Sequence, residues 1–136
     1  MKLSLLVSSL VLCVGCGGKS AGAVEPAPGP ATNCPDVGAH VGAALIAAVD
    51  AMAVNDPNLV PKPPTVEQKE QARGKLAAAV TDACVASWKS DAAACVLRAT
   101  MDDIEGCYVY LDEPGRQQLA TMIKEAVTNL VTPTTP

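Results

Sequence analysis

The sequence predicts an all-α protein, a small bundle of four to five helices that two disulfides hold together. The first observation is composition: 49% of the 136 residues are hydrophobic types, but the aromatic ones are one Trp, two Tyr and no Phe. A core of Ala, Val and Leu suits closely packed helices, whereas strands favour aromatic and β-branched side chains. The second observation is spacing, because apolar residues recur every three or four positions along most of the chain. The length fits one domain.

The chain begins with the features of a signal peptide. Lys2 supplies a short positive region, and the stretch 3–14 is apolar except for three serines. A helix that crosses a bilayer needs about 20 residues, so this stretch is too short to span a membrane and has the length of a signal-peptide core. We therefore expect residues 1–15 to be a signal peptide.

The segment Cys13-Val14-Gly15-Cys16 resembles a bacterial lipobox, with a small glycine directly before the last cysteine. In lipoproteins that thiol receives a diacylglycerol, the signal peptide is removed, and the cysteine becomes the first residue. The resemblance implies lipidation of Cys16 by several acyl chains, which anchor a protein stably where one chain does not. Gly17 stands where an Asp is associated with inner-membrane retention. The resemblance therefore implies the outer membrane of a Gram-negative bacterium.

Two other processing sites remain open. The segment Leu10-Val11-Leu12-Cys13 has the Leu that lipoboxes usually carry, but it puts bulky Leu12 beside the cysteine. Ordinary cleavage after Ala21-Gly22-Ala23 is the other alternative, because that segment has the small-x-small form. We favour Cys16. Cys13-x-x-Cys16 is then no redox or metal motif, since one cysteine leaves with the signal peptide and the other becomes a thioether.

Residues 16–33 are expected to be the lipidated cysteine and a disordered spacer. The spacer consists mostly of Gly, Pro, Ala and Ser, which cannot bury an apolar face. Its reach is about 25 Å as a flexible coil and up to about 50 Å as polyproline II. The helical domain is expected over 34–131, and residues 132–136 are expected to be a disordered tail.

The first helix is expected to begin at Cys34-Pro35-Asp36, because proline suits the first turn and an acidic residue favours the positive helix end. Asn55-Asp56-Pro57 ends it. Residues 55–64 contain four prolines and are expected to form an extended loop. The apolar face of this helix consists of Val37, Val41, Ala44, Leu45, Ala48 and Met52.

A second helix is expected to start at Thr65, which matches a capping box with Gln68, and to end near Ser87 or Trp88. Gly74 lies inside this helix and weakens it by about 1 kcal/mol relative to Ala, unless another helix packs closely there. The positions expected to face the core are Val66, Ala72, Leu76, Ala79, Val80 and Ala83.

Two short helices are expected next. Ser90 or Asp91 is expected to cap the first of them, and a break is expected at Ala99-Thr100, where Thr100 and Asp103 look like a second start signal. The second short helix is expected to run to about Tyr110. A continuous helix is the alternative. The inward positions are Leu97, Met101, Ile104, Tyr108 and Leu111.

The last helix is expected to open at Asp112-Glu113-Pro114, which combines a capping residue, an acidic first turn and an early proline. It completes the all-α prediction, since no segment of the chain reads as a convincing strand. The positions expected to face the core are Leu119, Met122, Ile123, Ala126, Val127 and Leu130.

Export would place the chain in an oxidising compartment, so Cys34, Cys84, Cys95 and Cys107 are expected to form two disulfides of about 2–4 kcal/mol each. If the chain breaks near Thr100, Cys95 can pair with Cys107 and Cys34 with Cys84, which is the pairing that we favour. In a continuous helix, Cys95 and Cys107 would lie about 18 Å apart, beyond the roughly 7 Å that a disulfide allows. The pairs would then be Cys84–Cys95 and Cys34–Cys107.

A four-thiolate zinc site is the other use that the same cysteines suggest. Zinc sites usually contain close pairs of ligands, and the spacings here are 50, 11 and 12 residues. We therefore expect no metal and no cofactor.

The other candidate residues do not form a catalytic set. His40, the only histidine, lies near the apolar face of the first helix and is expected to be a boundary residue with one hydrogen bond. Asp102, Asp103 and Glu105 are expected to be dipole partners in a first helical turn, since they lack the EF-hand spacing of a cation site. Trp88 is expected to be buried beside a disulfide rather than exposed for ligand stacking.

Along its whole length, the chain resembles a small, helical, four-cysteine bacterial lipoprotein of unknown function. Only the lipobox-like segment carries known chemistry in that resemblance. The features that carry the resemblance are the lipobox ending at Cys16, the Pro/Gly/Ala spacer, Cys34 at a helix start, the run of Cys84, Trp88, Cys95 and Cys107, and the last helix with its acid and Pro114.

We therefore expect a membrane-anchored cell-envelope lipoprotein whose helical module binds a partner or supports structure without catalysis. Its expected contacts are the membrane, through the lipid anchor, and another envelope protein or a small apolar ligand. The net charge of −4 and the lack of a basic patch argue against nucleic acid. A secreted or lipid-anchored enzyme with an unrecognised active site is the alternative, but the scarcity of His, aromatic and clustered polar residues disfavours it.

Overall fold

The computed structural model describes residues 27–132, and this part of the chain contains five helices and no strand. The expected all-α fold is therefore confirmed. The predicted signal peptide, the predicted lipidation site Cys16 and the last four residues lie outside the described residues. In chain order the helices are α1 (Cys34–Asn55), α2 (Val66–Ser87), α3 (Ser90–Val96), the 3-10 helix η1 (Ile104–Tyr110) and α4 (Glu113–Val131).

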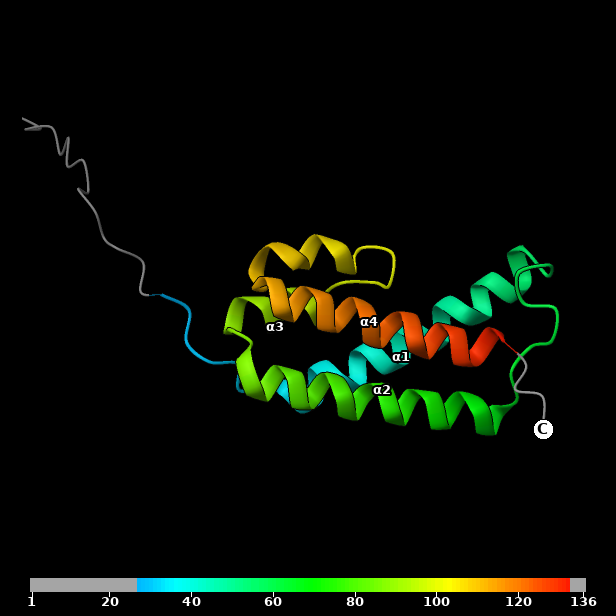
Figure 1. Cartoon of the computed structure of the whole chain (residues 1–136), viewed down its shortest axis with the longest axis horizontal. Helices are drawn as coiled ribbons and strands as arrows, with labels where there is room; N and C mark the ends of the chain where they lie inside the picture. Colours follow the sequence, from blue (N-terminus) through cyan, green and yellow to red (C-terminus); the bar gives the residue numbers. More distant parts are fainter. Residues whose placement is uncertain (1–26, 133–136) are drawn as a thin grey trace, which may run out of the picture.

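Three long helices form the body of the domain. Figure 1 shows α2 and α4 antiparallel and in front, with α1 crossing behind them. The most extensive packing is between α1 and α2, and α4 packs on both of these helices. The short helices α3 and η1 pack on each other near the end of the bundle where α4 begins (Figure 1). At the opposite end, the last part of α1 and the loop 56–65 extend beyond the other helices.

The core is organised around α1, whose large buried side chains recur at every fourth position. Val37, Val41, Leu45 and Val49 are at most 1% exposed, as the four-residue spacing of one helix face requires. Burial of each such side chain contributes roughly 1.5–3 kcal/mol to folding. The other helices add the buried residues Leu76, Val80, Ala83, Ala92, Ala93, Val96, Ile104, Leu119 and Leu130.

The predicted start of α2 is confirmed in detail. Thr65 Oγ1 accepts a hydrogen bond from the backbone N–H of Gln68 at 3.2 Å, and Gln68 Oε1 accepts one from the backbone N–H of Thr65 at 2.8 Å. The two bonds satisfy N–H groups that have no partner inside the helix. The predicted ends of the first two helices, at Asn55 and Ser87, are confirmed as well.

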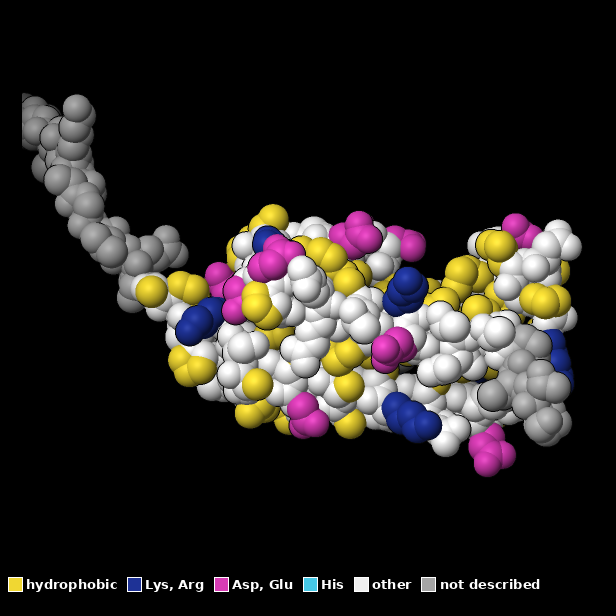
Figure 2. Space-filling view, in the orientation of Figure 1, with side chains coloured by type: hydrophobic (Ala, Val, Ile, Leu, Met, Phe, Trp, Pro, Cys, Tyr) yellow, Lys and Arg dark blue, Asp and Glu magenta, His cyan; other side chains and the backbone are white. Residues whose placement is uncertain are grey.

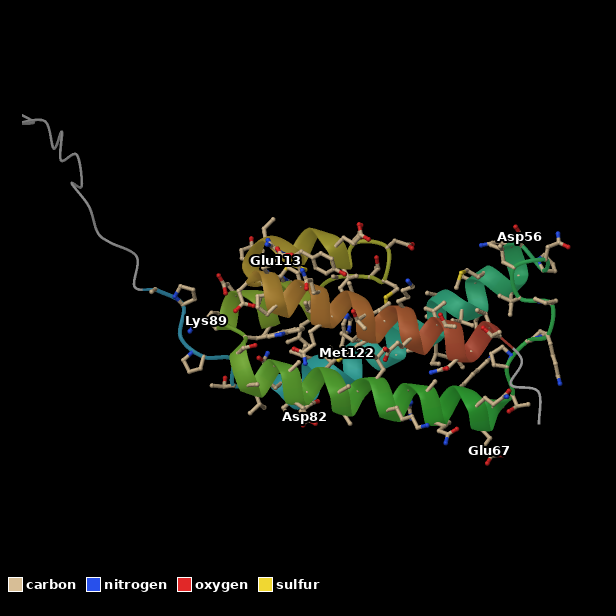
Figure 3. The ribbon with its side chains drawn as sticks, in the orientation of Figure 1. Asp56, Glu67, Asp82, Lys89, Glu113 and Met122 are labelled. Carbon is tan, nitrogen blue, oxygen red and sulfur yellow. A yellow bond between two sulfur atoms is a disulfide. The ribbon has the colours of Figure 1, made fainter. Side chains whose placement is uncertain are left out.

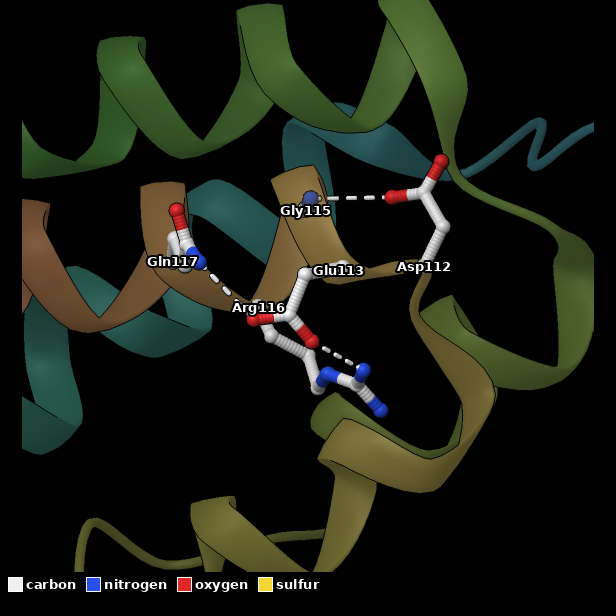
Figure 4. Close-up of polar contacts among 5 residues, drawn as sticks. All are labelled: Asp112, Glu113, Gly115, Arg116 and Gln117. Carbon is white, nitrogen blue, oxygen red and sulfur yellow. Dashed lines mark hydrogen bonds and ion pairs between the residues drawn. The ribbon is translucent and has the colours of Figure 1, made fainter.

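The start of α4 also follows the prediction. Asp112 Oδ1 accepts a hydrogen bond from the backbone N–H of Gly115 at 2.8 Å (Figure 4). In the first turn, Glu113 accepts hydrogen bonds from Arg116 and, at 2.8 Å, from Gln117. These hydrogen bonds hold the pKa of the Glu113 carboxyl below its usual value, and the one from Arg116 has the larger effect. A charged carboxylate at this place also interacts favourably with the positive end of the helix.

The predicted cap of α3 is wrong. Lys89, rather than Ser90 or Asp91, precedes the first turn, and no side chain caps this helix. Asp91 instead accepts a hydrogen bond from the neighbouring Ala92 N–H at 2.9 Å. The reason is tertiary: the Ser90 N–H, which a helix start leaves unpaired, donates to the Gly29 carbonyl at 2.9 Å.

The predicted break between the two short helices is confirmed. α3 ends at Val96, and turns lead to η1. Thr100 Oγ1 donates a hydrogen bond to Asp103 Oδ2 at 2.8 Å, and Asp103 directly precedes η1. The second segment ends at Tyr110 as predicted, but it is a 3-10 helix, a tighter form that proteins use in short pieces.

One predicted core position is wrong. Val66 is the first residue of α2 and is 77% exposed, so it does not contribute to the core. Gly74 is exposed as well, and no neighbouring helix would contact a side chain there. The loss of helix stability expected from Gly74 therefore applies without compensation from packing.

The segment before α1 is bonded to the domain. The Ala31 N–H donates to the Trp88 carbonyl at 3.1 Å, and the Gly29 carbonyl accepts from Ser90, so residues 29–31 pair with residues 88–90. Figure 3 shows Lys89 at this corner, at the end of the molecule opposite Glu67. The last residues of the predicted spacer therefore belong to the folded part of the chain.

Candidate functional site

Two disulfides fix the framework of the domain. Cys34 at the start of α1 is bonded to Cys84 near the end of α2, with 5.5 Å between the Cα atoms. Cys95 of α3 is bonded to Cys107 of η1, with 5.6 Å between the Cα atoms. The favoured pairing is therefore confirmed. The bond between Cys95 and Cys107 can form because the chain turns after Val96 and α3 packs against η1. In a continuous helix the two cysteines would be too far apart.

Trp88 closes the end of the bundle next to the first disulfide. It follows Cys84 by one helical turn, is only 3% exposed, and belongs to the same buried cluster as Cys34 and Cys84. Its predicted burial is therefore confirmed. The indole N–H has no hydrogen-bond partner among the described residues, so the side chain stabilises the fold through its apolar area.

His40 connects α1 with the turn that follows α3. Its Nε2 lies 2.8 Å from the Ala99 carbonyl oxygen, and the side chain is half-buried. Because a carbonyl oxygen only accepts, Nε2 is the protonated nitrogen that donates. The predicted role of a boundary residue with one hydrogen bond is confirmed.

The acidic residues before and within η1 lie at the surface. Asp102, Asp103 and Glu105 are exposed, and Asp103 accepts the hydrogen bond of Thr100. Within residues 27–132, no three His, Cys, Asp or Glu side chains are grouped so that they could hold a metal ion. The pKa of the Tyr108 hydroxyl is raised above its usual value. Burial of Tyr108 is the larger cause, and the negative charge of Glu105 is the second cause.

An open groove with a volume of about 710 Å³ lies between α2 and α4. Figure 2 shows the face of the molecule on which these two helices lie, hollowed between them. Lys75 of α2 and Glu125 of α4 stand on its opposite sides, and Met122 lies on the side of α4 that faces α2 (Figure 3). The remaining residues that line it are Gln68, Gln71, Ala72, Leu76, Ala79, Ala126, Thr128, Asn129, Leu130 and Thr132.

Helical spacing did not predict this groove. Ala72, Ala79 and Ala126 were predicted to face the core, but they are half-buried and line the groove. These short side chains line the facing sides of α2 and α4, and the groove between the two helices is open. The signal in the sequence that could have indicated the groove is the presence of alanines at inward positions of both helices.

Among the described residues, α1 alone has the length and apolar composition that a membrane-spanning helix would need. The core helix of a globular domain has the same properties. α1 is bonded to α2 through the disulfide Cys34–Cys84, and its residues Val37, Val41, Leu45 and Val49 form the centre of the core. It is therefore the central helix of this bundle.

No protein-family model, no curated protein and no solved structure matches the chain. The geometry itself defines the class: a disulfide-linked all-α domain with an open groove between two of its helices.

Proposed function

We propose that this protein is a lipoprotein of the bacterial cell envelope, anchored through Cys16, whose helical domain is a non-catalytic binding or structural module. The observation that carries the proposal is that the chain enters the domain at one end of the bundle, which leaves the sides of the bundle available for a partner. Residues 29–31 are held against residues 88–90 at one end of the bundle, so the described chain enters the helical domain at that end. The groove between α2 and α4 runs along the body of the bundle and remains open.

The cysteine and histidine side chains of the described domain have structural roles, which supports a non-catalytic binding module. The four cysteines Cys34, Cys84, Cys95 and Cys107 form disulfides, and a disulfide sulfur is not the thiolate that acts as a nucleophile. His40 is bonded to a backbone carbonyl, not to a serine or a thiol. A bundle held by disulfides keeps its shape with a small core, which suits a tethered module.

The lipid anchor is tested with the full-length chain in a Gram-negative host. We expect the protein to be labelled by a radioactive or clickable fatty acid and to sediment with membranes. Cys16→Ala should abolish the label and release the protein or leave an unprocessed precursor. Inhibition of the lipoprotein signal peptidase should leave the same precursor.

Cys13→Ala is the matched control, because it removes the cysteine of the alternative lipobox and leaves Cys16 in place. This variant should be labelled and processed like the wild type. Loss of the label in Cys13→Ala but not in Cys16→Ala would move the anchor to Cys13. If the double variant Cys13→Ala/Cys16→Ala is still labelled and retained at the membrane, the chain has no lipobox.

A further inference from the structure

We propose that the groove between α2 and α4 is the contact face of a homodimer, in which a second copy of the chain places its own α2 and α4 against it across a two-fold axis along the groove. The proposal deepens the proposed function by naming the partner of the module. Its test uses the soluble part of the chain, so its failure can be distinguished from failure of the lipid anchor.

The shape of the groove fits a helix pair. On α2 the lining residues Gln68, Gln71, Ala72, Lys75, Leu76 and Ala79 follow a three- and four-residue spacing, and on α4 the residues Met122, Glu125, Ala126, Asn129 and Leu130 do the same. Each helix thus turns one continuous stripe toward the groove. Two antiparallel helices with such stripes are half of a four-helix bundle, which a second identical pair can complete.

The charges on the groove are complementary to those of a second copy. Lys75 lies on the α2 side and Glu125 on the α4 side, both are exposed, and neither takes part in an ion pair within the described chain. A two-fold axis along the groove places α2 of one copy over α4 of the other. Lys75 of each copy then meets Glu125 of the other copy, so the dimer contains two ion pairs.

The same charges disfavour the other symmetric arrangement. A two-fold axis across the groove would place α2 over α2 and α4 over α4. An axis at the level of Lys75 and Glu125, which would superpose the two grooves, opposes Lys75 to Lys75 and Glu125 to Glu125. Like charges at these places cost free energy, so the electrostatics select the axis along the groove. In the selected arrangement the uncharged Gln71 of one copy lies over Asn129 of the other, and both can donate and accept hydrogen bonds.

The apolar part of the interface consists of the alanines and the methionine that line the groove. Ala72, Ala79, Met122 and Ala126 are half-buried in the single chain and would become covered in the dimer. The alanines allow a close approach of the helices, and Met122 can adapt its side chain to fill the remaining space. Because the apolar area is small, the dimer belongs to the weak, transient class of interfaces.

The test is sedimentation equilibrium of the soluble chain from Gly17 to Pro136, which contains all five described helices and both disulfides. We expect a monomer–dimer equilibrium between roughly 10 µM and 1 mM, weakened by salt. Lys75→Glu or Glu125→Lys alone replaces both ion pairs by repulsive contacts and should raise the dissociation constant by about tenfold, or about 1.4 kcal/mol. The double variant Lys75→Glu/Glu125→Lys restores opposite charges and should recover the wild-type constant.

Lys62→Glu provides the matched control, since it makes the same charge change in the exposed loop 56–65, away from the groove. It should leave the dissociation constant unchanged, and circular dichroism should show the same helix content for all variants. A wild-type chain that stays monomeric at about 1 mM would overturn the proposal and leave the groove to a different protein or ligand. A dimer that is insensitive to both single charge reversals, or that the double variant does not restore, would overturn it equally.

Discussion

Gly38 of α1 lies directly against the backbone carbonyl of Ala77 in α2. A Cβ atom built on Gly38 would come within 2.2 Å of the Ala77 oxygen and 2.2 Å of Thr81 Oγ1, far closer than non-bonded atoms approach each other. One turn later, a Cβ on Gly42 would lie 2.8 Å from the Arg73 carbonyl oxygen. The two glycines therefore set the distance between the two helices that make the most extensive contact in the domain.

Gly38→Ala is expected to destabilise the domain by about 2 kcal/mol. The new methyl group must push α1 away from α2, and overpacking of this kind costs typically 1–3 kcal/mol. The displacement also disturbs Thr81, whose hydroxyl donates to the Ala77 carbonyl at 2.8 Å. Urea denaturation with intact disulfides, followed by the fluorescence of the buried Trp88, measures the change as a lower midpoint at an unchanged slope.

Gly74→Ala is the matched control, because Gly74 lies in the middle of α2 but has nothing within 4 Å of the added atom. Here alanine should stabilise the domain by about 0.5–1 kcal/mol through its higher helix propensity. If the two substitutions shifted the midpoint in the same direction, the close contact between α1 and α2 would not be the cause of the effect at Gly38.

The sequence was informative wherever a structure depends on near neighbours in the chain. Thr65 with Gln68 and Asp112 with Gly115 are caps made by residues three apart, and both helix starts could be predicted from them. The break after α3 was predictable from Thr100 and Asp103 for the same reason.

Features that depend on packing between distant segments were not predictable in this way. The role of Gly38 depends on the position of Ala77, and the start of α3 depends on Gly29, which lies 61 residues earlier than Ser90. The groove depends on how far α4 lies from α2, which is a property of the assembled bundle. Helical spacing indicated which residues face inward but not how closely the facing helices approach each other.

The two disulfides should contribute unequally to stability. Cys34–Cys84 closes a loop with a sequence separation of 50 and Cys95–Cys107 one of 12. The chain-entropy model gives about 4 kcal/mol for the first and about 3 kcal/mol for the second. Cys34 and Cys84 are each 1% exposed, whereas in the second pair Cys107 is 1% exposed and Cys95 is half-buried, so replacement of the first pair by alanine leaves more empty volume in the core.

We therefore expect Cys34→Ala/Cys84→Ala to lower the free energy of unfolding more than Cys95→Ala/Cys107→Ala, by at least about 1 kcal/mol. Urea denaturation of the two paired variants measures this difference. Peptide mapping under non-reducing conditions establishes which bond each variant retains. An equal or reversed order would mean that the hairpin of α3 and η1 supports the core more than its short loop suggests.

Removal of the cap of α4 should destabilise the domain moderately. Asp112→Ala removes the side-chain oxygen that accepts from the Gly115 N–H at 2.8 Å, and loss of such a cap costs about 1 kcal/mol. Asp112→Asn keeps an acceptor oxygen at the same place and should retain most of the stability. Asp102→Ala, at an exposed turn position, controls for the loss of one negative charge and should have little effect.

The hydroxyl of Tyr108 should titrate above the usual pKa of a tyrosine, which is about 10. Burial is the larger cause, since it disfavours the charged phenolate, and the negative charge of Glu105 is the second cause. A pKa raised by folding means that the neutral form of Tyr108 stabilises the folded state relative to its phenolate. This contribution is complete below the unfolded pKa of about 10 and is lost as the pH rises through the folded pKa.

The measurement uses the Tyr110→Phe variant, in which Tyr108 is the only tyrosine and its phenolate absorbance near 295 nm reports one group. We expect a midpoint above 10 for the folded protein and a midpoint near 10 in denaturant. Glu105→Gln removes the smaller cause, so it should lower the folded midpoint in part and leave the denatured one unchanged. A folded midpoint at or below the denatured one would show that Tyr108 is not shielded from water as the packing of η1 on α3 indicates.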